Sequence, residues 1–239
     1  MIALDDVVVT AWTPDPHGGA EQVVRLLGPV TLRLGERRVA VVGANGSGKS
    51  TLARLLNGLV LPSSGTVRVD GLDTATDGPA VRRRVGFVFT DPNAQIVMPT
   101  PLEDVALSLR RRHPDAAGRE RAARAALRRF GLDDRADVPV HALSGGQRQL
   151  LALAAVLATE PDVLVCDEPT TLLDLRWRRT VDDLLAGLDQ QVVLVTHDLD
   201  AARRADRVLV VHEGQVVHDG DPHDAVAHYE ALMSEAGVP

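Results

Sequence analysis

The stretch GANGSGKS at residues 43–50 carries the clearest chemical signal in the sequence. It has the form G-x-x-x-x-G-K-[ST], whose glycines let the backbone wrap a phosphate chain with its N–H groups pointing inward. Lys49 is predicted to contact the terminal phosphates, and the Ser50 hydroxyl is predicted to ligate Mg²⁺. A helical run over residues 51–59 follows, as this motif requires. The residues expected to bind a nucleotide are Gly43, Ala44, Asn45, Gly46, Ser47, Gly48, Lys49, Ser50 and Thr51.

The strands that must position this loop are short, continuous apolar runs rich in β-branched residues. They cover residues 39–42, 163–166, 192–195 and 208–211. Such runs are typical of parallel strands that helices cover on both faces, so the sequence predicts an α/β fold with its site at the carboxyl ends of the strands. Residues 1–10 and 65–71 alternate more, which predicts an antiparallel β-subdomain. A short closing helix is expected from Ala225 onward.

Strand signals vanish between residues 91 and 160. The pattern there predicts helices over residues 102–112 and 118–130. A third helix is predicted to begin at Ser144, whose hydroxyl can cap the orphan N–H groups of the first turn. We interpret residues 91–160 as a helical insertion in the α/β domain.

The composition argues against several classes of protein. Acidic residues outnumber basic ones by 33 to 26, and the net charge of −7 disfavours sequence-independent binding of nucleic acid, which needs a cationic surface. No apolar run approaches the ~20 residues that span a bilayer, and the N-terminus lacks the basic start of a secretory signal. The single cysteine, Cys166, excludes an internal disulfide and suits a reducing compartment. We expect a soluble cytosolic protein that reaches a membrane only through a partner.

Further motifs carry a family resemblance. LSGGQ at residues 143–147 resembles the signature of the ATP-binding-cassette (ABC) ATPases. VLVCDEP at residues 163–169 looks like the Walker B strand of that family with its following glutamate, and THD at residues 196–198 is similar to the segment that carries its switch histidine. Together with the phosphate-binding loop, these motifs occur in the family's order and span essentially the whole chain.

The resemblance implies an architecture. It is that of a P-loop NTPase, with a RecA-like parallel sheet core, an antiparallel β-subdomain and an inserted α-helical subdomain. A single ABC ATPase domain would then occupy residues 1–239. Its α/β core with the β-subdomain would take residues 1–90 and 161–239, and the helical insertion with the signature motif would take residues 91–160.

The resemblance also implies catalytic roles. Asp167, at a buried strand end, would hold Mg²⁺ through its coordinated waters, since a carboxylate suits a hard cation. Glu168 would orient or deprotonate the water that attacks the γ-phosphate. His197, at a neighbouring strand end, would hydrogen-bond that water and the γ-phosphate, and Lys49 completes the set. The alternatives are a structural role for Glu168 and an incidental loop position for His197.

The signature motif supplies a second place where an anion can sit, because a hydroxyl and flexible backbone meet at a helix N-terminus. Its residues are Ser144, Gly145, Gly146 and Gln147. In the family, this motif of one subunit closes on the ATP held by the P-loop of the other, so the resemblance implies an ATP-dependent homo- or heterodimer. Asp174 matches the D-loop aspartate. Trp12 lies where the family usually carries an aromatic that stacks on adenine, with a packing role as the alternative.

Two places depart from the family pattern. After the strand at residues 85–89 the family usually has a glutamine that contacts Mg²⁺ and water, whereas this chain has Thr90. The Thr90 hydroxyl would reach the metal through a water, or Gln95 would take over part of the role. In the D-loop, Leu172 replaces the usual small residue and Leu175 the usual proline. These departures keep open the alternative of a weakly hydrolysing, nucleotide-sensing ABC subunit.

Two stretches indicate a branch of the family. DPNAQIV at residues 91–97 and LEDVA at residues 102–106 are similar to ATPases of energy-coupling-factor (ECF) importers, which carry vitamins or transition-metal ions. In that group the first stretch helps receive a coupling helix from the transmembrane T component, and a small membrane S component captures the solute. GDPHDAV at residues 220–226 resembles the biotin-type ATPases in particular.

The sequence therefore predicts a bacterial importer motor that hydrolyses ATP with Mg²⁺ on the cytoplasmic face of the cell membrane. The alternative is a soluble ABC ATPase that acts on nucleic acid or ribosomes.

Overall fold

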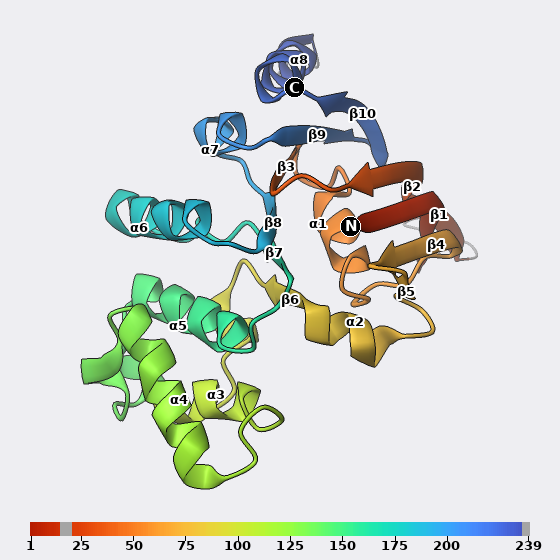
Figure 1. The fold of residues 1–239 in the computed structure, drawn as a ribbon. Helices are drawn as coiled ribbons and strands as arrows, with labels where there is room; N and C mark the ends of the chain where they lie inside the picture. Colours follow the sequence, from red (N-terminus) through yellow and green to blue (C-terminus); the bar gives the residue numbers. More distant parts are fainter. Residues whose placement is uncertain (15–20, 236–239) are drawn as a thin grey trace. The chain divides into compact units, whose positions relative to one another are not determined.

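The computed structural model describes residues 1–14 and 21–235, and the chain divides into two compact units (Figure 1). Unit 1 comprises Met1–Arg82 and Gln191–Pro239, and unit 2 comprises Arg83–Gln190. Helix α2 (Gly78–Arg84) crosses the boundary between them. No helix among the described residues is long and apolar enough to cross a bilayer. The division into a core and an insertion at residues 91–160 stays a prediction.

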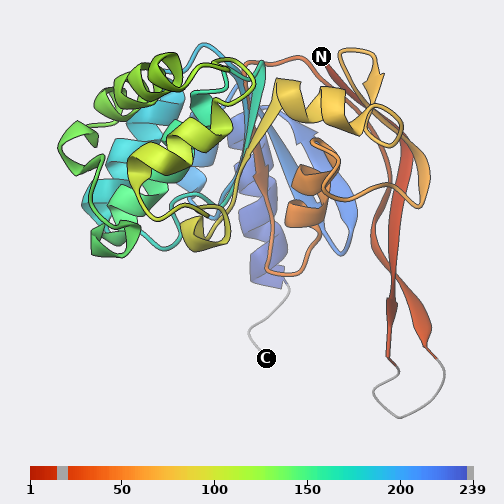
Figure 2. The same ribbon diagram turned by 90° about the horizontal axis from the view of Figure 1, so that it is seen from below.

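A four-stranded antiparallel sheet in unit 1 confirms the predicted β-subdomain. Its order is β2-β1-β4-β5. The strands are β1 (Ile2–Thr13), β2 (Gln22–Leu34), β4 (Ser64–Val69) and β5 (Leu72–Asp73). Figure 2 shows β1 and β2 as a long pair, which extends from Ile2 opposite Leu34 to Thr13 opposite Gln22 with register shifts between Leu4 and Thr10. Strand β2 was not predicted from the sequence.

Unit 1 also contains a sheet with parallel strands, as predicted. Strand β3 pairs in parallel with β8 on one side and with β9 on the other, and β10 runs antiparallel to β9. These strands are β3 (Arg38–Val42), β8 (Gln191–Val195), β9 (Arg207–His212) and β10 (Gln215–Gly220). The central residues of β3, β8 and β9 are buried, which explains why the apolar runs in the sequence are continuous rather than alternating.

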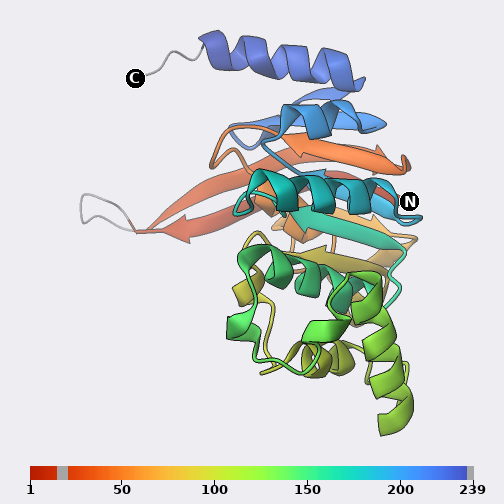
Figure 3. The ribbon, with the colours of Figure 1, turned by 90° about the vertical axis from the view of Figure 1, so that its left-hand side faces the viewer.

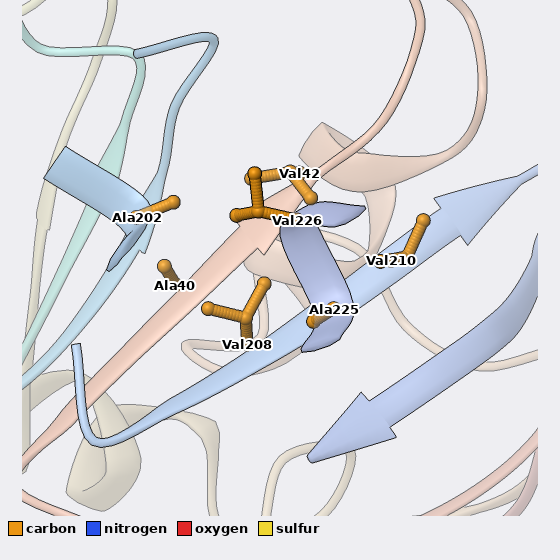
Figure 4. Close-up of a cluster of buried hydrophobic side chains, with 7 residues drawn as sticks. All are labelled: Ala40, Val42, Ala202, Val208, Val210, Ala225 and Val226. Atoms are coloured by element: carbon orange, nitrogen blue, oxygen red, sulfur yellow. The ribbon is translucent and has the colours of Figure 1, made fainter. Parts of the chain in front are cut away.

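Helices α7 (Leu199–Arg203) and α8 (Pro222–Glu235) cover one face of this sheet (Figure 3). Figure 4 shows the small aliphatic side chains that fill the space between them. The cluster consists of Ala40, Val42, Ala202, Val208, Val210, Ala225 and Val226. The closing helix was predicted from Ala225 and begins three residues earlier, at Pro222, a residue well suited to a first helical turn.

Helix α1 (Lys49–Leu55) follows β3 after the glycine-rich loop. The sequence predicted a helix to residue 59, which is too long. The chain turns at Gly58, whose φ of 70° is in the left-handed region that glycine adopts without a steric penalty. Leu52 and Leu55 are buried, so the helix is anchored in unit 1 by its apolar face.

Unit 2 combines a pair of parallel strands with helices. The strands are β6 (Val85–Val88) and β7 (Val163–Asp167), with Val88 opposite Cys166. The α-helices are α3 (Pro101–Ser108), α4 (Ala116–Arg129), α5 (Gly145–Leu157) and α6 (Leu175–Ala186). Single 3₁₀ turns are η1 (Pro92–Ala94), η2 (Asp133–Arg135) and η3 (Val140–Ala142).

Close packing and side-chain caps fix the unit 2 helices. A Cβ at Gly86 would overlap Val156, so glycine lets α5 approach β6. Ser144 caps α5 as predicted, and Thr100 and Asp115 cap α3 and α4. The helix predicted over residues 102–112 ends at Ser108, because the N–H groups that follow bond in tighter turns, among them that of Arg110 to the carbonyl of Leu107.

Candidate functional site

The glycine-rich loop of unit 1 has a backbone that only glycine adopts readily. Gly46 and Gly48 have φ values of 76° and 109°. A Cβ at Gly43 would overlap the carbonyl of Val211 and would lie 2.7 Å from the Ser47 hydroxyl. The N–H of Gly214 donates to the carbonyl of Ser47 at 2.8 Å, so the turn after β9 braces the loop from outside. The loop therefore has the open curve that a phosphate cradle needs.

The Lys49 side chain lies against the backbone of this loop. It is only 4% exposed, and Nζ donates to the carbonyls of Gly43 and Ala44, both at 2.9 Å. The ammonium thus lies over the loop's own backbone, where it is positioned to meet an anion. The Ser47 hydroxyl is buried and has no hydrogen-bond partner among the described residues. An orphaned buried donor at this place fits a phosphate ligand, because burial without a partner is costly.

His197 lies at the end of a strand next to this loop. Val41 of β3 is opposite Val195 of β8, and the N–H of Thr196 donates to the Val41 carbonyl at 3.1 Å. His197 follows as an exposed residue, and Asp198 then caps α7 by accepting from two N–H groups at 3.0 Å. The loop and His197 therefore share the carboxyl edge of the unit 1 strands, as the sequence predicts.

Asp167 is the last residue of strand β7 in unit 2, and Glu168 follows it. Asp167 is 2% exposed, and Glu168 has a φ of 51°, a strained value for a residue with a side chain. Thr171 donates a hydrogen bond to the Glu168 carboxylate at 3.2 Å and another to its backbone carbonyl at 3.3 Å. The motif assigns Thr171 no role, although its place three residues after Glu168 is the usual signal for such a turn contact. Thr171 thereby fixes the direction of the carboxylate.

Thr90 and Gln95, the two candidates for the glutamine role, lie at the end of β6. The Thr90 hydroxyl donates to the backbone carbonyl of Asp167 at 2.7 Å, which links the ends of β6 and β7. The Gln95 side-chain carbonyl accepts from the N–H of Phe89 at 3.3 Å, so Gln95 folds back beside Thr90. Both residues are thus at the carboxyl edge of the unit 2 strands.

Asp104, which belongs to the LEDVA stretch, is a positioning residue that was not predicted from the sequence. Its Oδ1 accepts the N–H groups of Val97 and Met98 at 2.9 and 3.1 Å, which fixes the end of the loop that contains Gln95. Burial raises the pKa of the Asp104 carboxyl, while these two hydrogen bonds act in the opposite direction.

The signature motif begins α5 with a reciprocal cap. The Ser144 hydroxyl accepts from the N–H of Gln147 at 3.2 Å, and the Gln147 side chain accepts from the N–H of Ser144 at 2.9 Å. Gln147 therefore has a structural role within the chain. In the D-loop, Asp174 caps α6 by accepting from the N–H of Trp177 at 3.0 Å.

Trp12 is on β1, opposite Val23 of β2, and is 70% exposed. A Cβ at Gly48 would lie 2.9 Å from the carbonyl of Leu26, so β2 passes the start of α1. Val23 is three residues along β2 from Leu26, a separation of roughly 10 Å. An adenine joined to a phosphate chain spans such a separation, and the exposed indole offers a face for stacking.

The residues expected to hold Mg²⁺ have suitable donor chemistry. Ser50 provides a hydroxyl on the first turn of α1, and Asp167 provides a buried carboxylate. Both are hard oxygen donors of the kind that Mg²⁺ selects, with water and phosphate oxygens completing its shell. The loop and His197 belong to unit 1, and Asp167 and Glu168 to unit 2, so their union in one site stays a prediction.

Curated relatives match most of the chain. A putative ABC transporter ATP-binding protein of Deinococcus radiodurans is 49% identical, covering 87% of this chain and 92% of the relative. The biotin transport ATP-binding protein BioM of Rhizobium etli is 44% identical with the same coverages, 87% and 92%. The energy-coupling factor transporter ATP-binding protein EcfA1 of Lactiplantibacillus plantarum is 42% identical, covering 82% of this chain and 71% of the relative.

Solved structures of similar proteins also match most of the chain. An ATP-binding cassette, solved as a dimer in a post-hydrolysis state with ADP and Pi, matches with a TM-score of 0.81 at 31% identity, covering 93% of this chain and 99% of the other. The cbiO1 protein of Clostridium perfringens, part of the ABC transporter complex cbiONQ, matches with a TM-score of 0.78 at 28% identity, covering 98% and 93%. The family profile described as ABC transporter matches residues 29–171. The chain belongs to the ABC transporter family and is one of its ATPases.

Proposed function

We propose that this chain is the ATP-hydrolysing motor of an ECF-type importer, with biotin as the favoured solute. The observation that carries the proposal is the 44% identity to BioM of Rhizobium etli over 87% of this chain. The identity of 42% to EcfA1 supports the same branch. In unit 2, residues 91–97 are similar in sequence to the stretch that forms part of the partner-binding groove in ECF ATPases. Asp104 anchors the end of this loop, so the loop has the fixed position that a docking surface needs.

In this proposal the P-loop holds the phosphates of ATP. Its backbone N–H groups and the N-terminus of α1 face the anion, and Lys49 moves its ammonium from the loop carbonyls onto the terminal phosphates. The Ser50 hydroxyl and the Asp167 carboxylate would hold Mg²⁺. When bound, that ion neutralises charge on the β- and γ-phosphates. Trp12 stacks on the adenine.

Hydrolysis follows from the groups at the strand ends. Glu168 accepts a hydrogen bond or a proton from the attacking water, which aligns its oxygen with the γ-phosphorus opposite the leaving oxygen of ADP. Thr171 holds the Glu168 carboxylate in direction through the 3.2 Å hydrogen bond. His197 donates to the γ-phosphate and contacts the same water. Thr90 or Gln95 orients the water from the other side.

A second copy or a related subunit completes each site. Ser144, Gly145 and Gly146 of one subunit are proposed to contact the ATP held by the other, with Asp174 at the interface between them. ATP binding then closes the dimer, and hydrolysis reopens it. The solved cassette dimer with ADP and Pi, which resembles this chain, supports such an assembly.

The motor is proposed to act on the cytoplasmic face of a bacterial membrane. Its partners would be a transmembrane T component and a small S component that captures the solute. A single ABC ATPase domain would form the motor, and the helical segment of residues 91–160 would transmit its closure to the T component.

The first experiment tests whether ATP causes the chain to dimerise. The Glu168→Gln chain is mixed with ATP and Mg²⁺, and its mass is measured by light scattering. We expect a dimer with ATP and a monomer with ADP. In parallel, phosphate release by the unchanged chain should exceed that of Glu168→Gln. Equal rates would favour the alternative of a nucleotide-sensing subunit.

The second experiment identifies the partners. The tagged chain is purified from detergent-solubilised native membranes, and co-purifying proteins are identified by mass spectrometry. A T-type membrane protein and a small S component are expected, and the S component is then tested with radiolabelled biotin. Recovery of ribosomal or nucleic-acid-bound proteins, with the chain absent from membranes, would contradict the importer assignment and leave the ATPase assignment in place.

A further inference from the structure

The two glycines of the signature motif have different surroundings. A Cβ at Gly145 would meet nothing within 4 Å, so the chain itself leaves room for a side chain there. A Cβ at Gly146 would overlap the indole of Trp177, with Cδ1 at 2.6 Å and two further ring atoms nearer still. The packing of unit 2 therefore requires glycine at position 146 but not at position 145.

Trp177 is connected to the D-loop by a helix cap. It lies in the first turn of α6, and its N–H donates to the Asp174 side chain that caps this helix at 3.0 Å. The indole is half-buried, and the guanidinium of Arg176 lies 6.0 Å from the ring centre. Figures 1 and 3 both show α6 next to α5. The ring thus extends from the D-loop to the first turn of the signature helix.

The rest of the D-loop packs less closely against that helix. Leu172 and Leu173 line a cavity of about 140 Å³ together with Gly145, Arg148 and Gln149 of the first turns of α5. Leu172 is 64% exposed, so most of its surface faces solvent. Two segments in close van der Waals contact move together, whereas segments separated by a cavity lack the contacts that would couple their movements. The contact between Trp177 and Gly146 is therefore the firm link between D-loop and signature motif.

We propose that Trp177 is a positioning residue that sets the signature motif against the D-loop for contact with ATP in the partner subunit. This inference rests on the proposed function, in which both segments lie at the dimer interface. Trp177 itself touches no nucleotide. Its removal leaves the P-loop of unit 1 intact and loosens the signature motif, so ATP binding by the monomer is preserved while closure of the dimer weakens.

The test uses the Glu168→Gln chain, in which ATP-dependent dimerisation is read by light scattering. Adding Trp177→Ala should raise the ATP concentration for half-maximal dimerisation about tenfold, since small misplacement of a binding group has effects of this order or larger. The affinity of the monomer for ATP, measured by equilibrium dialysis at low protein concentration, should stay within about twofold. Trp177→Phe, which retains an aromatic ring, should restore most of the dimerisation.

A suppressor experiment tests the contact itself. Gly146→Ala should abolish dimerisation, and adding Trp177→Ala should restore part of it, because the overlap with the indole is gone while the proposed contact of position 146 with ATP remains altered. Gly145→Ala is the matched control: it should fold with an unchanged unfolding temperature, lose dimerisation, and gain nothing from Trp177→Ala. Rescue by Trp177→Ala of the Gly146→Ala variant, but not of the Gly145→Ala variant, would be a non-additive effect. Two independent defects would not produce it.

The outcomes separate the two proposals. If the Glu168→Gln chain itself does not dimerise with ATP, the proposed function fails and this inference fails with it. If that chain dimerises and Trp177→Ala requires no more ATP, or if Gly146→Ala is not rescued, only the inference is overturned. Should Trp177→Ala fail to fold by circular dichroism, Trp177→Leu in the same set decides the question.

Discussion

Cys166 is the last residue of β7 before Asp167 and is fully buried. Burial, with the negative charge of Asp167 as a second cause, raises the pKa of its thiol well above the usual range. Since the thiolate is the reactive form, the folded chain should not react with N-ethylmaleimide at pH 7.5 over an hour. In urea the thiol should be modified fully, as mass spectrometry will show. Rapid labelling of the native chain would contradict the tight packing of β7.

Thr90 and Gln95 differ in the hydrogen-bond donors that their side chains still have available. The Thr90 hydroxyl already donates its proton to the Asp167 carbonyl at 2.7 Å. Gln95 uses its carbonyl toward Phe89, and its amide group carries two hydrogens that can be donated to water or phosphate. We therefore predict that Gln95→Leu lowers the maximal rate of phosphate release about tenfold. The matched change Thr90→Val should lower it only about twofold; the reverse ranking would assign the role to Thr90.

At the scale of elements, Asp104 connects α3 to the loop before it. Because burial raises its pKa from the ordinary 3.8, the folded chain keeps this proton to a higher pH than the unfolded chain does. The stability from this group is therefore fully present below pH 3.8 and is lost as the pH rises through the folded pKa. Both hydrogen bonds to Val97 and Met98 use Oδ1, which an asparagine also provides.

We predict from this geometry that Asp104→Asn is at least as stable as the unchanged chain at pH 7 in urea unfolding. Its stability should also fall less as the pH is raised from 4 to 7. Asp104→Ala leaves two N–H groups without their acceptor and should cost about 1–3 kcal/mol. A loss of stability in Asp104→Asn as large as in Asp104→Ala would contradict this account.

An element was predicted well where the interactions that stabilise it leave a local pattern in the sequence. The continuous apolar runs at residues 39–42 and 163–166 predicted their strands to within about a residue, because burial on both faces leaves a local signal. Strand β2 was missed, since its first five residues are exposed and Gly28 and Pro29 interrupt its apolar pattern. The end of α3 at Ser108 depends on local turn hydrogen bonds that periodicity does not reveal.

At the scale of the whole molecule, motif spacing predicted which residues gather at strand ends, because carboxyl ends of parallel strands share an edge. His197 beside the P-loop in unit 1, and Thr90 beside Asp167 in unit 2, follow this rule. Asp104 and Trp177 could not be predicted, since each acts through a contact with a specific backbone or side-chain atom. No spacing rule records such contacts.

The proposed contacts of ATP come from both units, so nucleotide should stabilise the whole chain. Ligand at 100 times its Kd adds about 2.7 kcal/mol. For a chain of this size that corresponds to a rise of about 5–10 °C in the unfolding midpoint. We predict this rise for Glu168→Gln with ATP and Mg²⁺ in differential scanning fluorimetry. Lys49→Ala should abolish the rise, and an equal rise in that variant would place the phosphates elsewhere.

The contact between Gly146 and Trp177 also constrains how related chains diverge. In a lineage that keeps the indole, alanine at position 146 overlaps it, so glycine there is maintained by internal packing as well as by any demand of the nucleotide. In a lineage where position 177 becomes small first, only the second demand remains. Position 177 must therefore change before the packing of unit 2 can tolerate a larger residue at position 146.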